Sequence, residues 1–370
     1  MARSVRYRRA RHLVSYWTDE GVVTWNYAAG KAVVNDAIVT HTLTLCGEWT
    51  PAGELRSRLR PVVTGSVDGF LRSMVREKLL VRSDQPVDPR ERAADTWGGW
   101  NPAAGFFHAS TKNVPGPRDR LATERALRRE YEAHGAPPKI KRYARAAVTA
   151  LPAARRSGEF ADVLLARRSW RKFSAEPIAL GDIATLLCLT SGVQRTETAL
   201  GLGPVHLKTS PSSGARQPLE AYLLAVNVAG LAPGLYHYVA DAHCLELVKK
   251  GATAKTIARY VPGQPWYEPA GALLMLTAVF ARTQWRYPFA RAYRSVLLEA
   301  GHVCQTFCLA ATWLGLAPFC TGRFADDIVE RDLRIDGVTE SFIYGAGVGH
   351  RPAGLDWAPW PEAVGPESDA

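Results

Sequence analysis

Residues 209–218 read TSPSSGARQP and lead directly into a segment of strand-like composition. The small hydroxyl residues and Gly214 let a planar ring approach the backbone, while Arg216 and Gln217 can hydrogen-bond to the polar edge of that ring. About forty residues earlier, residues 167–171 read RRSWR. Guanidinium groups and a hydroxyl within one turn can hold a phosphate, because an Arg fork matches phosphate oxygens bidentately. Either stretch alone would be an ordinary loop or a solvated basic face, but together they indicate a binding site.

The segments around these two stretches predict a domain of mixed helix and sheet. A helix at Phe160–Ala166 precedes residues 167–171, and a second helix is expected at Leu180–Ser191. The segment Ser295–Gly315 is apolar on nearly all faces, which is typical of a helix buried in a large core or in a subunit interface. Residue composition and intervening turns predict strands at Glu220–Val228, Leu235–Val239, Leu245–Val248, Ala272–Phe280, 317–321 and 341–348.

A separate amino-terminal unit is expected from about Leu13 to Arg82. Alternating apolar residues predict a strand at Val22–Tyr27, and the segments after it have helical spacing with plausible caps. A strand followed by three short helices is compatible with a winged-helix-like domain. The arginines at the start of the chain have no acidic neighbour and are expected to form a solvated tail. The helices are expected at Asp36–Cys46, Pro51–Leu59 and Asp68–Glu77, and the arginines are Arg3, Arg6, Arg8, Arg9 and Arg11.

The region between the two units is rich in Pro, charge and aromatic residues. Ser83–Ala94 is expected to be a linker. Aromatic and glycine residues are dense at 97–107, and we expect them to pin a loop to a core rather than to cover a ligand. The resulting boundaries are residues 1–85 for the amino-terminal unit, 86–158 for a linker with connecting helices, 159–352 for the second domain and 353–370 for a tail.

Composition restricts the class of protein. The 370 residues include 47% hydrophobic and 22% charged residues, as in folded globular proteins. The formal charge of +11 favours an anionic partner, such as a phosphorylated cofactor, a nucleic acid, an acidic peptide or a membrane surface. The longest apolar stretch, Gly271–Ala281, is far shorter than a membrane span of roughly 20 residues, and no signal peptide is recognised. A cytoplasmic protein that binds no membrane is therefore expected.

Cysteines and metal ligands give no separate site. The six cysteines form no C-x-x-C pair and are expected to be buried small hydrophobic residues in a reducing compartment. Glu299 and His302 have the spacing of a carboxylate-bridged metal pair, but the further ligands that such sites need are not recognised. A structural role is expected for both residues, and no metal site is predicted.

Several ordered motifs carry a resemblance to a known family. They are the R-R-S-x-R stretch at 167–171, the P-S-S-G-A-R stretch at 211–216, the segment Asn227–Tyr238 and the segment Glu299–Gln305. Together they resemble the SagB-type branch of the nitroreductase family over about Glu159–Pro352. The resemblance implies an α+β flavin fold, with a central, mostly antiparallel sheet and flanking helices, and a homodimer that holds FMN at the subunit interface.

The resemblance also implies the residues that bind FMN. The arginine cluster would contact the phosphate and the flavin edge. The 211–216 loop, of the same or of the partner subunit, would reach the ring. A segment after residue 320 would bring backbone near flavin N5, and a late arginine would contact the phosphate. The residues implied are Arg167, Arg168, Ser169, Arg171, Pro211, Ser212, Ser213, Gly214, Arg216, Thr321, Gly322 and Arg351.

Most proteins of this branch are similar to enzymes that oxidise thiazoline or oxazoline rings in ribosomally made peptides to thiazole or oxazole. That chemistry needs a flavin, a base for the ring Cα proton and a pocket for the peptide. The family has a Lys-Tyr pair at the proton-transfer position, where this chain has Arg286-Tyr287. Arg stays protonated and is a poor base, so Tyr287 is expected to relay the proton with Arg286 beside it.

Three functions remain open on the sequence. The first is azoline oxidation in a modified precursor peptide, with the amino-terminal unit gripping a leader peptide or a partner cyclodehydratase. The second is an FMN-dependent reaction on another small or carrier-bound substrate, which the Arg286 departure favours. The third is a DNA-binding regulator. It is the least favoured, because residues 1–90 are only mildly basic once the arginine run is excluded and no helix shows a concentrated basic face.

Overall fold

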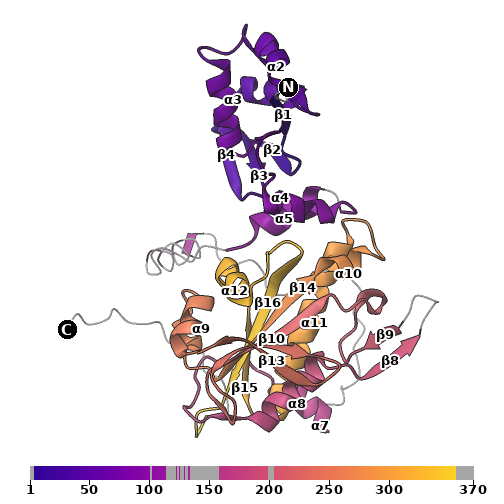
Figure 1. Cartoon of the computed structure of the whole chain (residues 1–370). Helices are drawn as coiled ribbons and strands as arrows, with labels where there is room; N and C mark the ends of the chain where they lie inside the picture. The colour runs from indigo at the N-terminus through magenta and orange to yellow at the C-terminus, as the bar shows by residue number, and fades with distance from the viewer. Residues whose placement is uncertain are drawn as a thin grey trace, which may run out of the picture.

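The computed structural model describes residues 4–100, 102–113, 158–198 and 204–355, with isolated positions between 122 and 133. A six-stranded antiparallel sheet in the order β13-β12-β10-β14-β16-β15 forms the centre of the second domain (Figure 1). This is the mostly antiparallel sheet expected from the sequence. Its strands are β10 (Leu219–Ala225), β12 (Gly234–Val239), β13 (Cys244–Lys250), β14 (Ala272–Val279), β15 (Ala317–Thr321) and β16 (Glu340–Gly349).

Helices cover both faces of this sheet, and alternate residues of each central strand point to opposite faces. Side chains are therefore buried on both sides. In β10, Leu223 packs with the core that includes helices α8 (Leu180–Ser191) and α11 (Ala292–Trp313), whereas Leu224 packs with the core that includes α9 (Ala254–Tyr260) and α12 (Asp326–Leu333). Residues of β14 are buried on both faces in the same way. The central strands therefore read as continuous apolar runs rather than as alternating ones.

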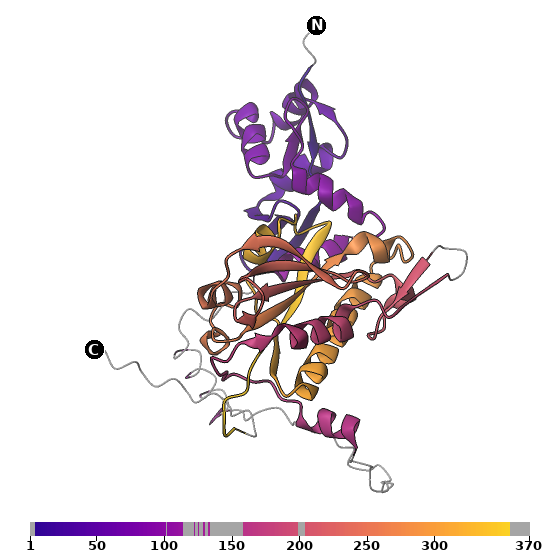
Figure 2. The same ribbon diagram turned by 60° about the horizontal axis from the view of Figure 1, so that its bottom comes forward.

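The helices of this domain follow the expected positions. Helix α7 (Glu159–Ala166) begins one residue before the predicted helix, and α8 has the predicted bounds. Helix α11 extends three residues further toward the amino terminus than predicted and ends two residues earlier. Figure 2 shows α7 standing apart from the body, and α7 contains no buried residue. The fold class predicted for this domain is confirmed.

The amino-terminal unit contains the predicted strand and three helices. Two sheets accompany them, one in the order β5-β1-β6 and a meander β2-β3-β4. The Asp36 carboxylate caps the first helix by accepting hydrogen bonds from two backbone N–H groups, and the Ser66 hydroxyl caps the third. The elements are β1 (Arg6–Arg9), β2 (Leu13–Thr18), β3 (Gly21–Asn26), β4 (Lys31–Asn35), α1 (Ala37–Leu45), β5 (Thr50–Pro51), α2 (Ala52–Leu59), α3 (Val67–Arg76) and β6 (Leu80–Arg82).

The prediction of a solvated arginine tail is wrong. Strand β1 lies between β5 and β6 in the small sheet, and Tyr7 is part of the core of this unit. The Arg8 guanidinium is buried against the Glu91 carboxylate at 3.1 Å. The acidic partner lies far along the sequence, so the local composition gave no indication of the pairing. Arg3 lies outside the described residues.

The linker prediction holds only as far as Asp88. Its carboxylate caps a short helix, α4 (Pro89–Ala94), which begins with a proline at its first position. Helix α5 (Pro102–Ser110) follows, and Figure 1 shows both helices between the amino-terminal unit and the sheet domain. The segment is ordered because Glu91 and Ala94 are buried.

Aromatic residues of this connecting segment pin it to the sheet domain, as expected. Trp97 and Trp100 belong to the same core as α8 and α11, and the Trp97 indole donates a hydrogen bond to the Val338 carbonyl at 3.0 Å. The Trp97 ring lies 4.7 Å from the Phe280 ring, at an edge-to-face angle. These contacts attach the amino-terminal unit to the second domain.

The cysteine prediction is correct in part. Cys46, Cys304 and Cys308 are buried, but Cys244 is exposed on β13, an edge strand of the sheet. All six cysteines are free thiols. Among the described residues, no helix is both long and apolar enough to cross a membrane. The greater part of residues 114–157 and all of 356–370, including most of the predicted tail, lie outside the described residues.

Candidate functional site

The loop at 211–217 packs against the segment that follows α10 (Phe280–Gln284). Gly214 has φ +59°, a left-handed conformation that favours glycine. A Cβ added at Gly214 would lie 2.6 Å from the Tyr287 hydroxyl and 2.9 Å from Cδ of Arg286. Because no side chain fits there, the loop backbone lies directly against Arg286 and Tyr287. The structure thus brings together two groups that the sequence separates by about seventy residues.

Arg286 and Tyr287 interact with each other. Nε of Arg286 donates to the Tyr287 hydroxyl at 3.2 Å, and its guanidinium lies 5.6 Å from the centroid of the Tyr287 ring. The neighbouring Trp285 ring is exposed and stacks under the Arg216 guanidinium at 5.2 Å. A permanent cation therefore adjoins the Tyr287 hydroxyl.

A buried carboxyl group, that of Glu299, forms a hydrogen bond with Ser212 of the same loop. Glu299 lies on α11 with only 4% of its surface exposed. Burial raises the pKa of Glu299 to about 7, against the opposing effects of a hydrogen bond with Ser212 and the positive charge of Lys208. Burial also lowers the pKa of Lys208, although Glu220 and Glu299 oppose that change. A carboxyl group with a pKa near neutrality can hold or release a proton under physiological conditions.

A cavity of about 460 Å³ lies beside the loop. Its wall includes Lys208, Arg216 and a charged network in which the Glu220 carboxylate binds both His237, at 3.1 Å, and Arg282. Although burial opposes it, hydrogen bonds from His237 and Arg282 lower the pKa of Glu220. The hydrogen bond to Glu220 raises the pKa of His237. The cavity is polar and lies directly outside the predicted ring-binding loop.

The predicted phosphate-binding arginines lie elsewhere, around β15. Arg351 donates to the carbonyls of Leu316 at 3.0 Å and Thr312 at 3.4 Å, and its guanidinium lies 5.4 Å from the Trp170 ring. Burial lowers the pKa of Arg351. Arg167 is half-buried near Cys320. Neither guanidinium has a carboxylate partner within the part of the chain that the structure describes.

The other residues of this group have identifiable contacts. Arg168 donates to the carbonyls of Leu165 and Arg167, so part of its guanidinium serves the end of α7. The Thr321 hydroxyl donates to the Gln264 side chain at 2.9 Å, and Gly322 is exposed just after β15. Ser169 and Arg171 are half-buried in the same segment. Two half-buried cations without carboxylate partners, Arg167 and Arg351, fit an anionic group such as a phosphate.

The two groups of predicted site residues meet opposite ends of α11. Arg286 and Tyr287 precede the helix, whereas Arg351 contacts Thr312 near its last turn. The 22 residues of α11 span roughly 30 Å at about 1.5 Å per residue. Arg351 and Tyr287 therefore lie near opposite ends of this helix, whereas Ser210, beside the predicted ring loop, hydrogen-bonds to Thr306 in its middle.

Four charged residues of this site were missed in the sequence. They are Lys208 in the segment before the 211–217 loop, Glu220 in β10, His237 in β12 and Arg282 in α10. The sheet pairing of β10 with β12 brings Glu220 beside His237. The only available signal was the unusual charge within otherwise apolar strands. In the sequence, Glu299 belongs to a family motif, and a structural role rather than a metal site is expected for it. Glu299 is buried whereas His302 is exposed, and the described residues contain no cluster that could hold a metal ion.

Comparison with known proteins gives the family. The model of the nitroreductase family, whose members are FMN-dependent oxidoreductases, matches residues 164–350. A nitroreductase-family protein of Methanocaldococcus jannaschii is 32% identical over 174 residues, covering 47% of this chain and 83% of that protein. The trifolitoxin-processing protein TfxB of Rhizobium leguminosarum bv. trifolii is 34% identical over 176 residues, covering 46% of this chain and 47% of TfxB.

The chain thus spans about half the length of TfxB. Among solved structures, a chain of the Escherichia coli microcin synthetase McbBCD complex, bound to truncated pro-MccB17, superposes with a TM-score of 0.52 at 18% identity. The match covers 73% of this chain and all of that one, and at this identity it shows a shared fold. Residues 164–350, which the family model matches, contain the central sheet, Arg167 and the 211–217 loop. The chain belongs to the nitroreductase family and is an oxidoreductase of that family.

Proposed function

We propose that this protein is an FMN-dependent dehydrogenase that oxidises azoline rings to azoles in a ribosomally made peptide. The observation that carries the proposal is the contact of the Gly214 loop with the Arg286-Tyr287 pair, next to a polar cavity. The likeness to a trifolitoxin-processing protein supports a peptide substrate. The resemblance to the SagB-type branch supports the ring oxidation.

The half-buried, carboxylate-free arginines fit the phosphate of FMN. Arg167 and Arg351 would hold the phosphate, and Pro211–Arg216 would lie along the ring. FMN, when bound, would accept the hydride that leaves the azoline ring. From the family resemblance, we propose that each FMN lies between two copies of the chain, with the 211–216 loop supplied by the partner.

An apolar surface that the described part of the chain leaves exposed supports this homodimer. Phe160 on α7 is 72% exposed, Leu298 on α11 is 63% exposed, and Trp313 at the end of α11 is 52% exposed. Leu164 and Leu165 on α7 are also exposed. Exposed apolar patches of this kind mark interaction surfaces. A second copy laid along α7 and α11 would cover them, because it would bring its own exposed helices to the same place.

The residues around Tyr287 would handle the proton of the reaction. Tyr287 would act as the phenolate, which the hydrogen bond from Nε of Arg286 would stabilise. The phenolate oxygen would take the proton from the ring carbon and become the phenol hydroxyl. The Glu299 carboxyl group, held near neutrality by burial, keeps Ser212 and the loop in place. Lys208 and Arg216 would line the side from which the peptide approaches.

The decisive experiment uses the purified, FMN-loaded protein under anaerobic conditions. Addition of a peptide that contains a thiazoline ring should bleach the flavin absorbance and yield the peptide two mass units lighter, since the reaction removes two hydrogens. A peptide with the unmodified cysteine is the control and should leave the flavin oxidised. An unbleached flavin with every azoline peptide would contradict the proposal.

Arg167→Gln tests the phosphate site. Loss of one charge-assisted bond of about 1.5–3 kcal/mol should weaken FMN binding by roughly ten- to a hundredfold. The measurement is the dissociation constant of FMN by flavin fluorescence. Lys172→Gln removes an exposed cation from the same segment and should bind FMN as the unmodified protein does. Equal affinity of both variants would remove Arg167 from the site.

Tyr287→Phe tests the proton step. The variant keeps the ring against Gly214 but lacks the hydroxyl, so FMN binding should persist while the anaerobic bleaching rate falls by about a hundredfold or more, the scale of general acid–base catalysis. Tyr16→Phe, on the distant strand β2, is the control. Full turnover by Tyr287→Phe would exclude Tyr287 as the proton acceptor.

A second candidate function is an FMN-dependent reaction on another small or carrier-bound substrate. It is favoured by Arg286, which stands where the resemblance implies a lysine. Under this alternative, bleaching would require a different reductant and azoline peptides would be inert. The partners that we propose for the leading function are the modified precursor peptide and a cyclodehydratase, with the amino-terminal unit as the surface that grips one of them.

A further inference from the structure

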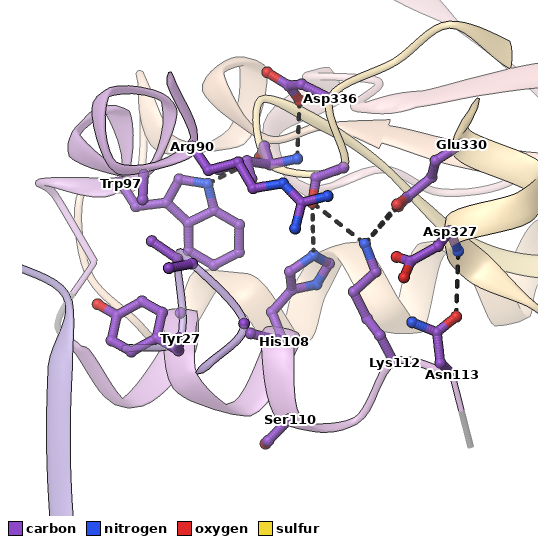
Figure 3. Close-up of a pocket in the computed structure, with 18 of the residues that line it drawn as sticks. Tyr27, Arg90, Trp97, His108, Ser110, Lys112, Asn113, Asp327, Glu330 and Asp336 are labelled. Carbon is purple, nitrogen blue, oxygen red and sulfur yellow. Dashed lines mark hydrogen bonds and ion pairs between the residues drawn. The ribbon is translucent and has the colours of Figure 1, made fainter. Parts of the chain in front are cut away.

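We infer that the pocket between the amino-terminal unit and the flavin domain binds an acidic residue of the peptide substrate. The pocket has a volume of about 360 Å³, which lies at the lower end of the range for ligand sites. One wall comes from the turn after β3 and from α4, and the other from α12 and the loop before β16 (Figure 3). The assignment of a peptide as occupant rests on the proposed function.

Of the two cations that line this pocket, Arg90 has no counter-ion among the described residues. Figure 3 shows Arg90 extending from α4 toward the middle of the pocket, on the side of Trp97. No ion pair or side-chain hydrogen bond engages the Arg90 guanidinium within the ranges that the structure describes. An unpaired guanidinium at a concave site favours a carboxylate, which it can bind through two parallel hydrogen bonds.

Three of the other charged side chains in the wall are already engaged. Lys112 is paired with the buried Glu330 carboxylate at 2.6 Å. The Asp336 carboxylate accepts the backbone N–H groups of Val338 and Thr339, each at 2.8 Å. Asp327, in the first turn of α12, also lines the pocket and could accept a backbone N–H of a bound peptide. The positive charge of Arg90 is therefore the one available to an anionic ligand.

Aromatic surface accompanies the Arg90 guanidinium in this pocket. Trp25, Tyr27 and Trp97 all line it. The combination suits an acidic side chain flanked by apolar ones, and it agrees with the formal charge of +11.

The occupant would contact both units at once. Arg90 and Trp25 belong to the amino-terminal side of the pocket, whereas Asp327 and Val338 belong to the flavin domain. A peptide anchored by its acidic residue here would be held on the same chain that carries the flavin site. The pocket would thus select peptides by an acidic residue distant from the ring that is oxidised.

The test uses the full chain and two probe peptides, acetyl-Phe-Glu-Phe-amide and acetyl-Phe-Gln-Phe-amide, with binding followed by tryptophan fluorescence. We expect the Glu peptide to bind about ten- to a hundredfold more tightly than the Gln peptide, as the loss of one charge-assisted bond predicts. Arg90→Gln should abolish this preference. Arg92→Gln changes the same residue type on the same helix, outside the pocket, and should preserve it.

Several outcomes would overturn the inference. They are equal binding of the two peptides, absence of binding, and equal loss in Arg90→Gln and Arg92→Gln. If N-acetylglutamate binds as tightly as the Glu peptide, the pocket is a site for small carboxylates and not for a peptide. The assay does not involve ring oxidation, so failure of anaerobic bleaching with intact probe binding would reject the proposed function alone.

Discussion

Trp97→Ala is expected to lower the free energy of unfolding by about 3–5 kcal/mol, the cost of truncating a large buried aromatic residue. Trp97 is 7% exposed and packs edge-to-face on Phe280 and Trp100. Its removal leaves a cavity where the connecting segment meets the sheet domain. The Val338 carbonyl also loses its indole donor. The measurement is urea unfolding at neutral pH, followed by far-ultraviolet circular dichroism.

The control for this variant is Trp17→Ala. The Trp17 side chain is 84% exposed on strand β2, so its loss should change the free energy of unfolding by less than about 0.5 kcal/mol. If the free energy of unfolding of Trp97→Ala lies within about 1 kcal/mol of that of the parent, the connecting segment does not share the core of the sheet domain. Separate unfolding transitions for the two units would lead to the same conclusion.

His108 is expected to make the protein less stable in mild acid. Burial and the nearby Lys112 lower the pKa of His108 to about 3, against a hydrogen bond to the Gly337 carbonyl that opposes the change. In the unfolded chain the pKa is about 6.5. The folded state thus binds fewer protons, so stability that is present above pH 6.5 is lost as the pH falls toward 3.

Between pH 7 and pH 5, this one group should cost the folded state about 2 kcal/mol. The comparison is with His108→Gln, which does not titrate and can still bond to Tyr293 and Gly337. Glu299, whose pKa is raised to about 7, makes an opposite contribution that both proteins share. The difference between the two unfolding free energies should therefore change by about 2 kcal/mol over this range.

His41→Gln is the control for the His108 experiment, because His41 is exposed on α1. Its difference from the parent protein should stay constant between pH 7 and pH 5. A constant difference for His108→Gln as well would show that His108 accepts a proton in the folded state, and that the packing between Trp97 and Tyr293 admits water.

Local sequence patterns predicted most of the helices and strands of the sheet domain. The strands at β10, β12 and β14 and the long helix α11 are continuous apolar runs, and such runs identify buried elements without knowledge of their partners. The same reasoning failed for β1. Arg8 in this strand is paired with Glu91, which lies about eighty positions away, and periodicity contains no information on pairing at that distance.

The chemical groups of the candidate site follow from the sequence alone. The RRSWR and TSPSSGARQP stretches carry side chains suited to a phosphate and to a planar ring, and they contributed to the recognition of the family. Only the tertiary structure decided how these groups are placed. It put Gly214 against Tyr287, buried Glu299 beneath Ser212, and held Arg351 at the far end of α11. Packing of strands and helices sets distances between residues remote in sequence, and burial sets the pKa of Glu299, so neither could be obtained from local composition.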